Sequence, residues 1–223
     1  MSIASRYQSP ADLPLSLAVF PLPGAVVLPR ADLPLNIFEP RYLAMVADAL
    51  AGSRLIGVIQ PREDSADLAV KPALCRVGCA GRITSYMETP DNRVLITLTG
   101  VCRFAVLSEL VTVTAYRQVE PDYAPFAQDL TRDHGQEAVD RTALLAAFRN
   151  DLEANGLKAD WDQVKGASNE TLVNTLSLIA PYPARDKQAL LEAADLKARA
   201  DVLVALTEMS LARQGPGPGN RLQ

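Results

Sequence analysis

The 223-residue sequence has one histidine, three cysteines and no apolar run near the ~20 residues that span a bilayer. A single histidine, His134, leaves little material for acid–base catalysis or for a histidine-rich metal site. An odd number of cysteines argues against a disulfide framework and favours a reducing compartment. The polar first twelve residues do not resemble a signal peptide. We therefore expect a cytoplasmic protein with no membrane segment.

Positive charge is also scarce. Residues 1–120 contain 11 Lys+Arg and 11 Asp+Glu, and residues 121–223 contain 11 and 15, which gives a net charge of −4. A general nucleic-acid binder neutralises phosphates with a basic face, which neither half provides. Apolar residues make up 48% of the chain, enough to form a globular core. A folded protein that does not bind nucleic acid is the expectation.

The motifs of common catalytic classes are missing as well. The sequence has no HExxH, GxSxG, Ser-x-x-Lys or CxxC pattern, and no Gly-Lys dipeptide of a P-loop. Cys75 and Cys79 share a strand face but would lie about 13 Å apart, too far for one tetrahedral zinc. We expect no enzyme activity, no metal site and no cofactor.

The first 120 residues have the pattern of a β-rich subdomain with one helix. Seven prolines in the first 40 residues mark strand ends, and residues 88–92 have the composition of a hairpin turn. Pro40 suits the first turn of a helix that ends at Gly52. The expected strands are Leu15–Phe20, Ala25–Leu28, Leu33–Phe38, Arg54–Gln60, Leu74–Met87, Val94–Thr99, Val101–Leu107 and Leu110–Val119.

Residues 121–214 have helical periodicity and predict a bundle of three or four helices. The expected helices are Gly135–Asn155, one capped by Ser168 and stopped by Pro181, Arg185–Ala194, and Leu196–Gln214 with Asp195 as its cap. Residues 215–223 are rich in glycine and proline, and we expect them to form a disordered tail.

Several segments resemble the Lon protease N-terminal domain family. FPLPGAVVLP at 20–29 and LPLNIFEPRY at 33–42 resemble its opening signature, and LTGVCRF at 98–104 and KQALLE at 187–192 follow in the family's order. The match runs from about residue 13 to residue 212. One departure stands out, because the family usually has a glycine where this sequence has Arg30.

This resemblance implies an α+β fold: a six-stranded, PUA-like β pseudo-barrel with one inserted helix, followed by a C-terminal helical bundle. It implies a stand-alone, non-catalytic module that binds polypeptides and lacks the ATPase and protease modules of Lon. The signature residues have expected structural roles: Phe38 staples the helix to the barrel, Glu39 caps it, Arg103 is paired and Phe104 is in the core. The full set is Phe38, Glu39, Pro40, Arg41, Tyr42, Arg103 and Phe104.

Four apolar residues in turn-like places are candidate contacts for polypeptide segments: Tyr86 and Met87 near the hairpin tip, and Tyr123 and Phe126 in the connector between subdomains. Local packing is the competing interpretation for all four. Other partners stay open, namely a separate AAA+ protease, a second copy in a homodimer, or RNA, which PUA-like barrels bind in other families. RNA phosphates would have to be met by Arg54, Arg62, Arg76, Arg82 and Arg93.

Overall fold

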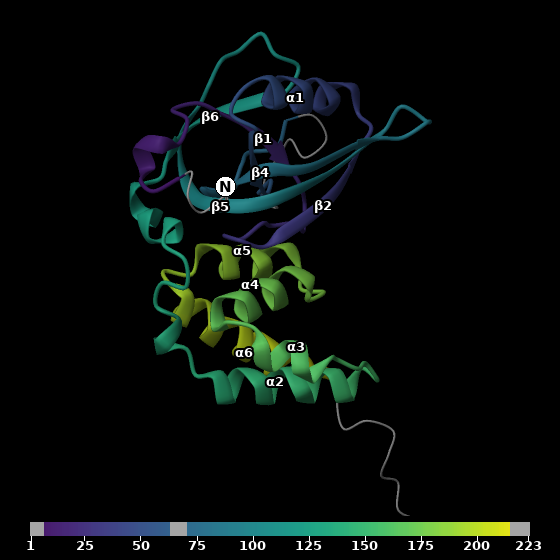
Figure 1. Cartoon of the computed structure of the whole chain (residues 1–223), viewed down its shortest axis with the longest axis vertical. Coiled ribbons are helices and arrows are strands. Elements are labelled where there is room, and N and C mark those ends of the chain that lie inside the picture. Colours follow the sequence, from purple (N-terminus) through teal and green to yellow (C-terminus); the bar gives the residue numbers. More distant parts are fainter. Residues whose placement is uncertain (1–6, 63–70, 215–223) are drawn as a thin grey trace, which may run out of the picture.

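Six strands form one sheet that closes on itself in the computed structural model, which describes residues 7–62 and 71–214. The strand order is β2-β5-β4-β3-β1-β6, and β5 also pairs with β6. β1 and β3 pair in parallel and the other neighbours are antiparallel. The strands are β1 (Leu17–Pro21), β2 (Asp32–Ile37), β3 (Leu55–Ile59), β4 (Val77–Glu88), β5 (Val94–Glu109) and β6 (Arg117–Asp122). We call this part the barrel lobe (Figure 1).

One helix is inserted in the barrel lobe, between β2 and β3, as predicted. α1 (Pro40–Ala51) has Pro40 in its first turn and buries Tyr42, Met45, Val46 and Ala49, the spacing of one helix face. The Tyr42 ring packs on Phe20 of β1 with centroids 4.2 Å apart. The inserted helix therefore covers part of the barrel core.

The strand expected to break at Gly100 is instead continuous. β5 runs through Gly100, where the backbone of Leu28 and Pro29 crosses so closely that an added Cβ would lie 2.0 Å from the Leu28 carbonyl oxygen. The expected strand Ala25–Leu28 is wrong, because this segment forms no ladder; it buries Val26, Val27 and Leu28 as a loop. Glycine is needed at position 100 for close approach of another chain segment, and not as a strand end.

The expected strand Leu110–Val119 is wrong over its first half. Residues 110–116 form a loop, and pairing with β1 and β5 begins only at Arg117. The β-branched Val111 and Val113 are fully exposed on this loop. Their residue types favour strand, but strand propensity reflects cross-strand packing and these two valines have none in the structure.

The helical lobe contains more helices than the three or four expected: α2 (Arg141–Ala154), α3 (Trp161–Gly166), α4 (Asn169–Ile179), α5 (Ala184–Glu192) and α6 (Leu196–Gln214). Ser168 accepts a bond from Thr171 N and Asp195 accepts one from Ala198 N, so both predicted caps are confirmed. The helix expected from Gly135 begins at Arg141, because Asp140 caps it. Short 3₁₀ turns lie at Pro10–Asp12 (η2), Ala124–Leu130 (η3) and Gln136–Ala138 (η4).

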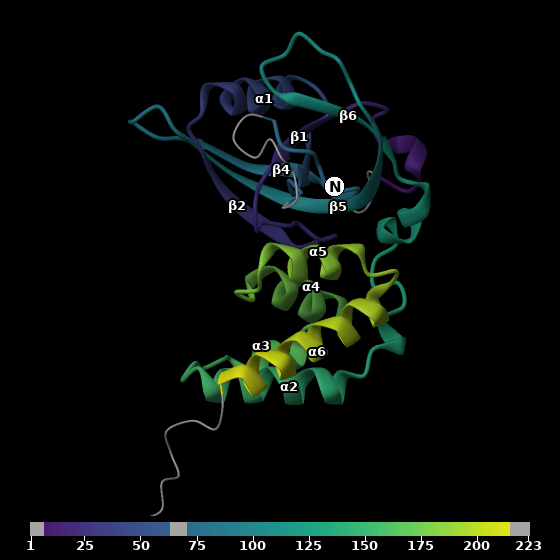
Figure 2. The same cartoon turned by 180° about the vertical axis from the view of Figure 1, so that it is seen from behind.

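The helical lobe lies against one side of the barrel. Both views show α5 and α4 nearest the barrel and α2 at the far end (Figures 1 and 2). Leu191 of α5 belongs to the barrel core, so apolar packing is continuous across the junction. β6 continues to Asp122, past the expected boundary at residue 120, and the expected tail lies outside the described residues. No described helix has the length and hydropathy to cross a membrane.

Candidate functional site

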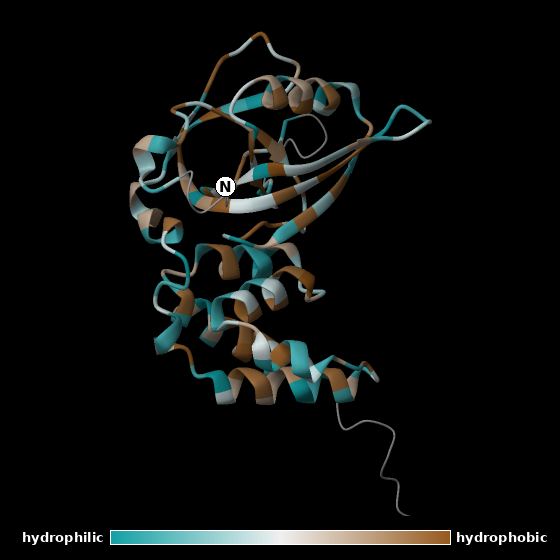
Figure 3. Cartoon of the chain, viewed as in Figure 1, coloured by the Kyte–Doolittle hydropathy of each residue, from teal (hydrophilic) through white to brown (hydrophobic). Residues whose placement is uncertain are grey.

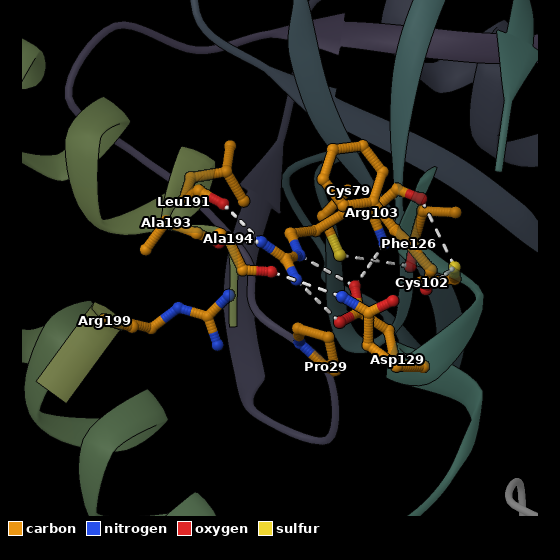
Figure 4. Close-up of polar contacts among 12 residues, drawn as sticks. Pro29, Cys79, Cys102, Arg103, Phe126, Asp129, Leu191, Ala193, Ala194 and Arg199 are labelled. Carbon is orange, nitrogen blue, oxygen red and sulfur yellow. Dashed lines mark hydrogen bonds and ion pairs between the residues drawn. The ribbon is translucent and has the colours of Figure 1, made fainter. Parts of the chain in front are cut away.

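Charged side chains fill the middle of the junction between the lobes (Figure 4). Arg103 on β5 is buried and meets the Asp129 carboxylate with two bonds, Nε to Oδ2 at 2.8 Å and Nη2 to Oδ1 at 2.9 Å. Its Nη1 donates to the carbonyls of Leu191 and Ala193 in the helical lobe. The predicted pairing of Arg103 is thus confirmed, and this residue connects the barrel to α5.

A second pair of residues extends this junction. Buried Arg199 on α6 donates from Nε to the Leu190 carbonyl and from Nη1 to Asn174 Oδ1, both at 2.9 Å, and Asn174 donates to the Pro29 carbonyl. Burial, with the like charge of Arg103, lowers the pKa of Arg199 to about 10. The guanidinium is therefore still charged at neutral pH. The bonds of these side chains go to one another and to backbone carbonyls and join the two lobes, while Arg199 Nη2 has no partner among the described residues.

The other signature residues are divided between core and surface. Phe104 is fully buried, as predicted, and its ring occupies the space that a Cβ at Gly78 would take. Phe38 does not staple α1: its side chain is 59% exposed, with the Arg93 guanidinium 5.6 Å from the ring centroid. Glu39 occupies the N-cap position of α1, as predicted, but its side chain makes no capping bond and accepts one from Arg41 Nε at 2.9 Å instead.

Tyr86 and Met87 are both exposed near the end of β4, but they face opposite sides of the sheet. Tyr86 pairs across the strands with Ile96, and Met87 pairs with Leu95. Met87 lies in a shallow groove on the barrel, which we call the barrel groove, and Tyr86 does not. The turn beyond them is hydrophilic (Figure 3). The barrel groove is lined by Pro34, Leu35, Asn36, Ser85, Met87, Leu95, Ile96 and Thr97.

The two candidates in the connector are less accessible. Tyr123 is only 5% exposed and packs edge-on to Phe104, so its side chain is core and does not face a partner. Phe126 is half-buried, with the Arg103 guanidinium 4.6 Å from its ring centroid. Local packing accounts for both rings, although the buried Tyr123 hydroxyl has no hydrogen-bond partner among the described residues.

An apolar cavity lies within the helical lobe, between α2, α4 and α6, and we call it the helical-lobe pocket. Its volume is about 170 Å³. Buried Leu144, Ala147 and Leu203 form its floor, and exposed Leu157 and Ile179 stand among its lining residues. Sequence reasoning missed this pocket, since each helix was assigned one apolar face for the core. One signal was available: Ile179 ends α4, and a Pro-Tyr-Pro sequence follows after one further residue, Ala180.

A recess of about 340 Å³ also lies between the lobes, lined by Gln60, Pro61, Arg62, Cys75, Ala184, Arg185 and Gln188. Two glutamines of its lining bond across the junction: Gln60 donates to the Ala184 carbonyl at 2.9 Å, and Gln188 donates to the Val77 carbonyl at 3.1 Å. The recess is thus a cleft formed by residues of both lobes. Its lining, however, offers less apolar surface than the helical-lobe pocket.

Catalytic chemistry finds little support among the side chains described. No group of three His, Cys, Asp or Glu in this part of the chain could hold a metal ion. Burial raises the pKa of Cys79 to about 12 and raises the pKa of Cys102 as well, so both thiols are poor nucleophiles. Of the arginines considered for RNA, Arg82 donates to Tyr7 and to the Ser53 carbonyl, and Arg93 pairs with Asp91.

Comparison with known proteins agrees with this architecture. The family model of the ATP-dependent protease La (LON) substrate-binding domain matches residues 16–208. Lon protease 2 of Sorangium cellulosum is 29% identical over 208 residues, which cover 88% of this chain and 25% of that protein. Lon protease 2 of Myxococcus xanthus is 27% identical, with coverage of 87% and 24%. The chain thus spans about a quarter of the length of these relatives.

Two solved structures share the fold. A Lon N-terminal domain protein from Xanthomonas campestris has a TM-score of 0.61 at 23% identity, covering 85% of this chain and 97% of that one. The N-terminal domain of Mycobacterium avium complex Lon protease has a TM-score of 0.64 at 18% identity, covering 86% and 98%. With the family model matching most of its length, the chain belongs to the Lon substrate-binding domain family.

Proposed function

We propose that this chain is a non-catalytic module that binds exposed segments of other polypeptides. The observation that carries the proposal is the helical-lobe pocket, an apolar cavity bordered by apolar side chains that remain exposed. Apolar surface left open to water in this way marks an interaction site. The family model, described as a substrate-binding domain, supports the same function.

The barrel groove is the second surface in this proposal. Met87, at 55% exposed, and Leu95 offer apolar contacts beside the backbone of three strands. Each surface alone is small, so we expect a client to bind both weakly and to gain affinity from simultaneous contact. Tyr86 would not take part in this groove, because it points to the other face of the sheet.

Binding of an unfolded client tests the proposal. A fluorescently labelled protein, reduced and alkylated so that it stays unfolded, would be titrated with the full chain and followed by anisotropy. We expect binding in the micromolar range, on the order of −8 kcal/mol, and none to the native form of the same client. Met87→Ser should weaken binding and Tyr86→Ser should not. Absence of binding to the unfolded client at any attainable concentration would refute the proposal.

An adaptor role is the variant suggested by the relatives, which are named as proteases roughly four times as long. In that version the chain presents clients to a separate AAA+ protease. Client binding by the isolated chain distinguishes a self-sufficient module from an adaptor that needs the protease to form its site.

We further propose that the barrel is of the PUA-like type, supported by its closed strand order with one parallel pair.

A further inference from the structure

We propose that the helical-lobe pocket anchors one bulky apolar side chain, of the leucine or phenylalanine type, from a polypeptide that carries a lysine or arginine next to it. This inference rests on the proposed function and narrows it to one pocket and one class of sequence. Three features carry it: the size of the cavity, its preformed walls, and one carboxylate without a cationic partner.

The size of the pocket suits a single side chain. Apolar cavities of about 150 Å³ in protein cores accommodate benzene. The helical-lobe pocket, at about 170 Å³, has room for a phenylalanine ring or a leucine side chain. One aromatic side chain buries only about 150–250 Å², far less than the ~1,200–2,000 Å² interface of a stable dimer, so the pocket by itself does not define a contact with a second folded copy.

The walls of the pocket are held in place without a ligand. The Tyr182 and Thr207 hydroxyls lie 2.8 Å apart in a hydrogen bond, and Thr207 also donates to the Leu203 carbonyl at 2.8 Å. These bonds connect the turn after α4 to α6. Leu157 N donates to the Leu152 carbonyl at 2.8 Å, which fixes the turn after α2. A preformed site avoids the cost of ordering side chains on binding.

The apolar entrance makes binding favourable. Leu157 is 60% exposed and Ile179 is 66% exposed, while Leu144 and Leu203 below them are buried. An incoming apolar side chain would fill the cavity and remove the exposed faces of Leu157 and Ile179 from water at the same time. The entrance and the floor therefore act together on one occupant.

A negative charge at the pocket favours a client in which a lysine or arginine lies next to the anchored apolar side chain. Asp151 is the one charged residue that lines the pocket, and no cation within the described ranges 7–62 and 71–214 forms an ion pair with it. Arg149, on the same helix, stacks on the Trp161 ring at 4.7 Å instead. Lys187 donates to the Leu178 carbonyl. Asp151 Oδ1 accepts a hydrogen bond from Asn155 Nδ2 at 3.1 Å, and the carboxylate keeps further acceptor positions for a cation brought by the client.

Methyl NMR with defined peptides tests the inference. The full chain, labelled at Ile, Leu and Val methyl groups, would be titrated with acetyl-Gly-Lys-Leu-Phe-Lys-Gly-amide and with the same peptide carrying glutamate in place of lysine. We expect the basic peptide to shift the methyl signals of Leu144, Leu176, Ile179, Leu203 and Val204, with an affinity about three- to tenfold above that of the acidic peptide. Shifts confined to the barrel lobe would overturn the inference.

Matched variants separate the two parts of the site. Asp151→Asn should remove the preference for the basic peptide, whereas Glu153→Gln, the same charge change on an exposed residue of α2, should retain it. Ala147→Leu fills the pocket and should lower peptide affinity at least tenfold. Val204→Phe fills the pocket from α6 and serves as the second variant in case Ala147→Leu does not fold. Equal preference in Asp151→Asn and the unaltered chain would overturn the inference.

The outcome also distinguishes this inference from the proposed function. If the pocket variants bind the unfolded client as well as the unaltered chain does, the anchor site is wrong while polypeptide binding stands. If the unaltered chain binds neither the client nor either peptide, both proposals fall.

Discussion

Arg30 has a backbone conformation that favours glycine. Its φ is 63°, in the left-handed region that residues with a side chain rarely adopt. A non-glycine residue there costs on the order of 1–3 kcal/mol. The side chain compensates: it forms a two-point ion pair with the buried Glu170 carboxylate and donates to the Asp129 carbonyl at 2.6 Å. Arg30 thus forms a contact between the lobes.

Replacement of Arg30 by glycine should therefore destabilise the protein, although it relieves the backbone. Relief of the backbone contributes about 1–3 kcal/mol, whereas a buried Glu170 carboxylate that has lost its cation and keeps only the Asp133 N–H donor costs about 3–5 kcal/mol. Arg30 is partly exposed, so we expect a net loss of about 1–3 kcal/mol in urea unfolding. The double variant Arg30→Gly with Glu170→Gln should recover most of it. Unchanged or higher stability of Arg30→Gly would mean that the ion pair contributes nothing.

A buried thiol and a buried tyrosine hydroxyl predict that the protein loses stability at alkaline pH. Burial raises the pKa of Cys79 to about 12, and burial with the bond to Asp48 raises the pKa of Tyr116 to about 12. Both folded pKa values exceed the unfolded values of 9.0 and 10.0. The folded state therefore holds protons that the unfolded state releases, so this stability is complete below about pH 9 and is lost as the pH rises toward 12.

Urea unfolding between pH 8 and 11 checks this sign. The free energy of unfolding should be flat near pH 8 and then fall, by at most about 1.4 kcal/mol per pH unit for each group. Cys79→Ala should have lower stability at pH 8 but a smaller decline above pH 9. A free energy that rises from pH 9 to 11, or an equal decline in the variant, would contradict the assignment.

Among the elements, those with strong local signals were predictable from the sequence. Pro40 and Gly52 bound α1, and Ser168 and Asp195 cap α4 and α6, because proline, glycine and capping residues act within one turn. α3 was missed, since six residues give too few repeats for helical periodicity. Residues 110–116 were misassigned, because whether a β-branched segment is a strand depends on a distant partner.

The candidate site was less predictable than the fold. A pocket such as the one between α2, α4 and α6 depends on how three helices pack. The apolar pattern of a single helix does not specify the spacing between that helix and its neighbours. Tyr123 and Phe126 were judged by their place in a proline-flanked connector, but η3 folds them onto the barrel beside Phe104 and Arg103. Turn-like context indicates exposure only where the turn stays away from the core.

Continuity of β5 makes Gly100 the most sensitive glycine of the barrel. In Gly100→Ala, the new Cβ would meet the Leu28 carbonyl oxygen, a backbone atom that cannot rotate away. We expect a loss of about 3 kcal/mol or more, comparable to severe overpacking. Gly166→Ala is the control: nothing lies within 4 Å of its Cβ position in α3, and the change should be neutral or stabilising by up to about 1 kcal/mol. If the two variants have the same urea midpoint, then the close approach of the Leu28 backbone to Gly100 is not present in solution.

At the scale of the molecule, the junction makes two lobes behave as one. Arg103, Arg30 and Asn174 each bind across it, and Leu191 of the helical lobe lies in the barrel core. Inter-domain contacts that are small and polar allow independent motion, whereas buried and mutually satisfied groups do not. A client that binds both the helical-lobe pocket and the barrel groove would then meet a rigid pair of sites.

Two probes in different lobes test this cooperativity. Trp161, the single tryptophan, reports on the helical lobe by fluorescence, and the buried thiols of Cys79 and Cys102 report on the barrel by labelling during urea unfolding. We expect one midpoint from both probes. Asp129→Ala leaves the Arg103 charge buried without its carboxylate, a cost of about 3–5 kcal/mol, and should lower both midpoints together. Separate midpoints in the unaltered chain, or a shift of the thiol transition alone in Asp129→Ala, would show that the lobes fold independently and that the junction is only a contact.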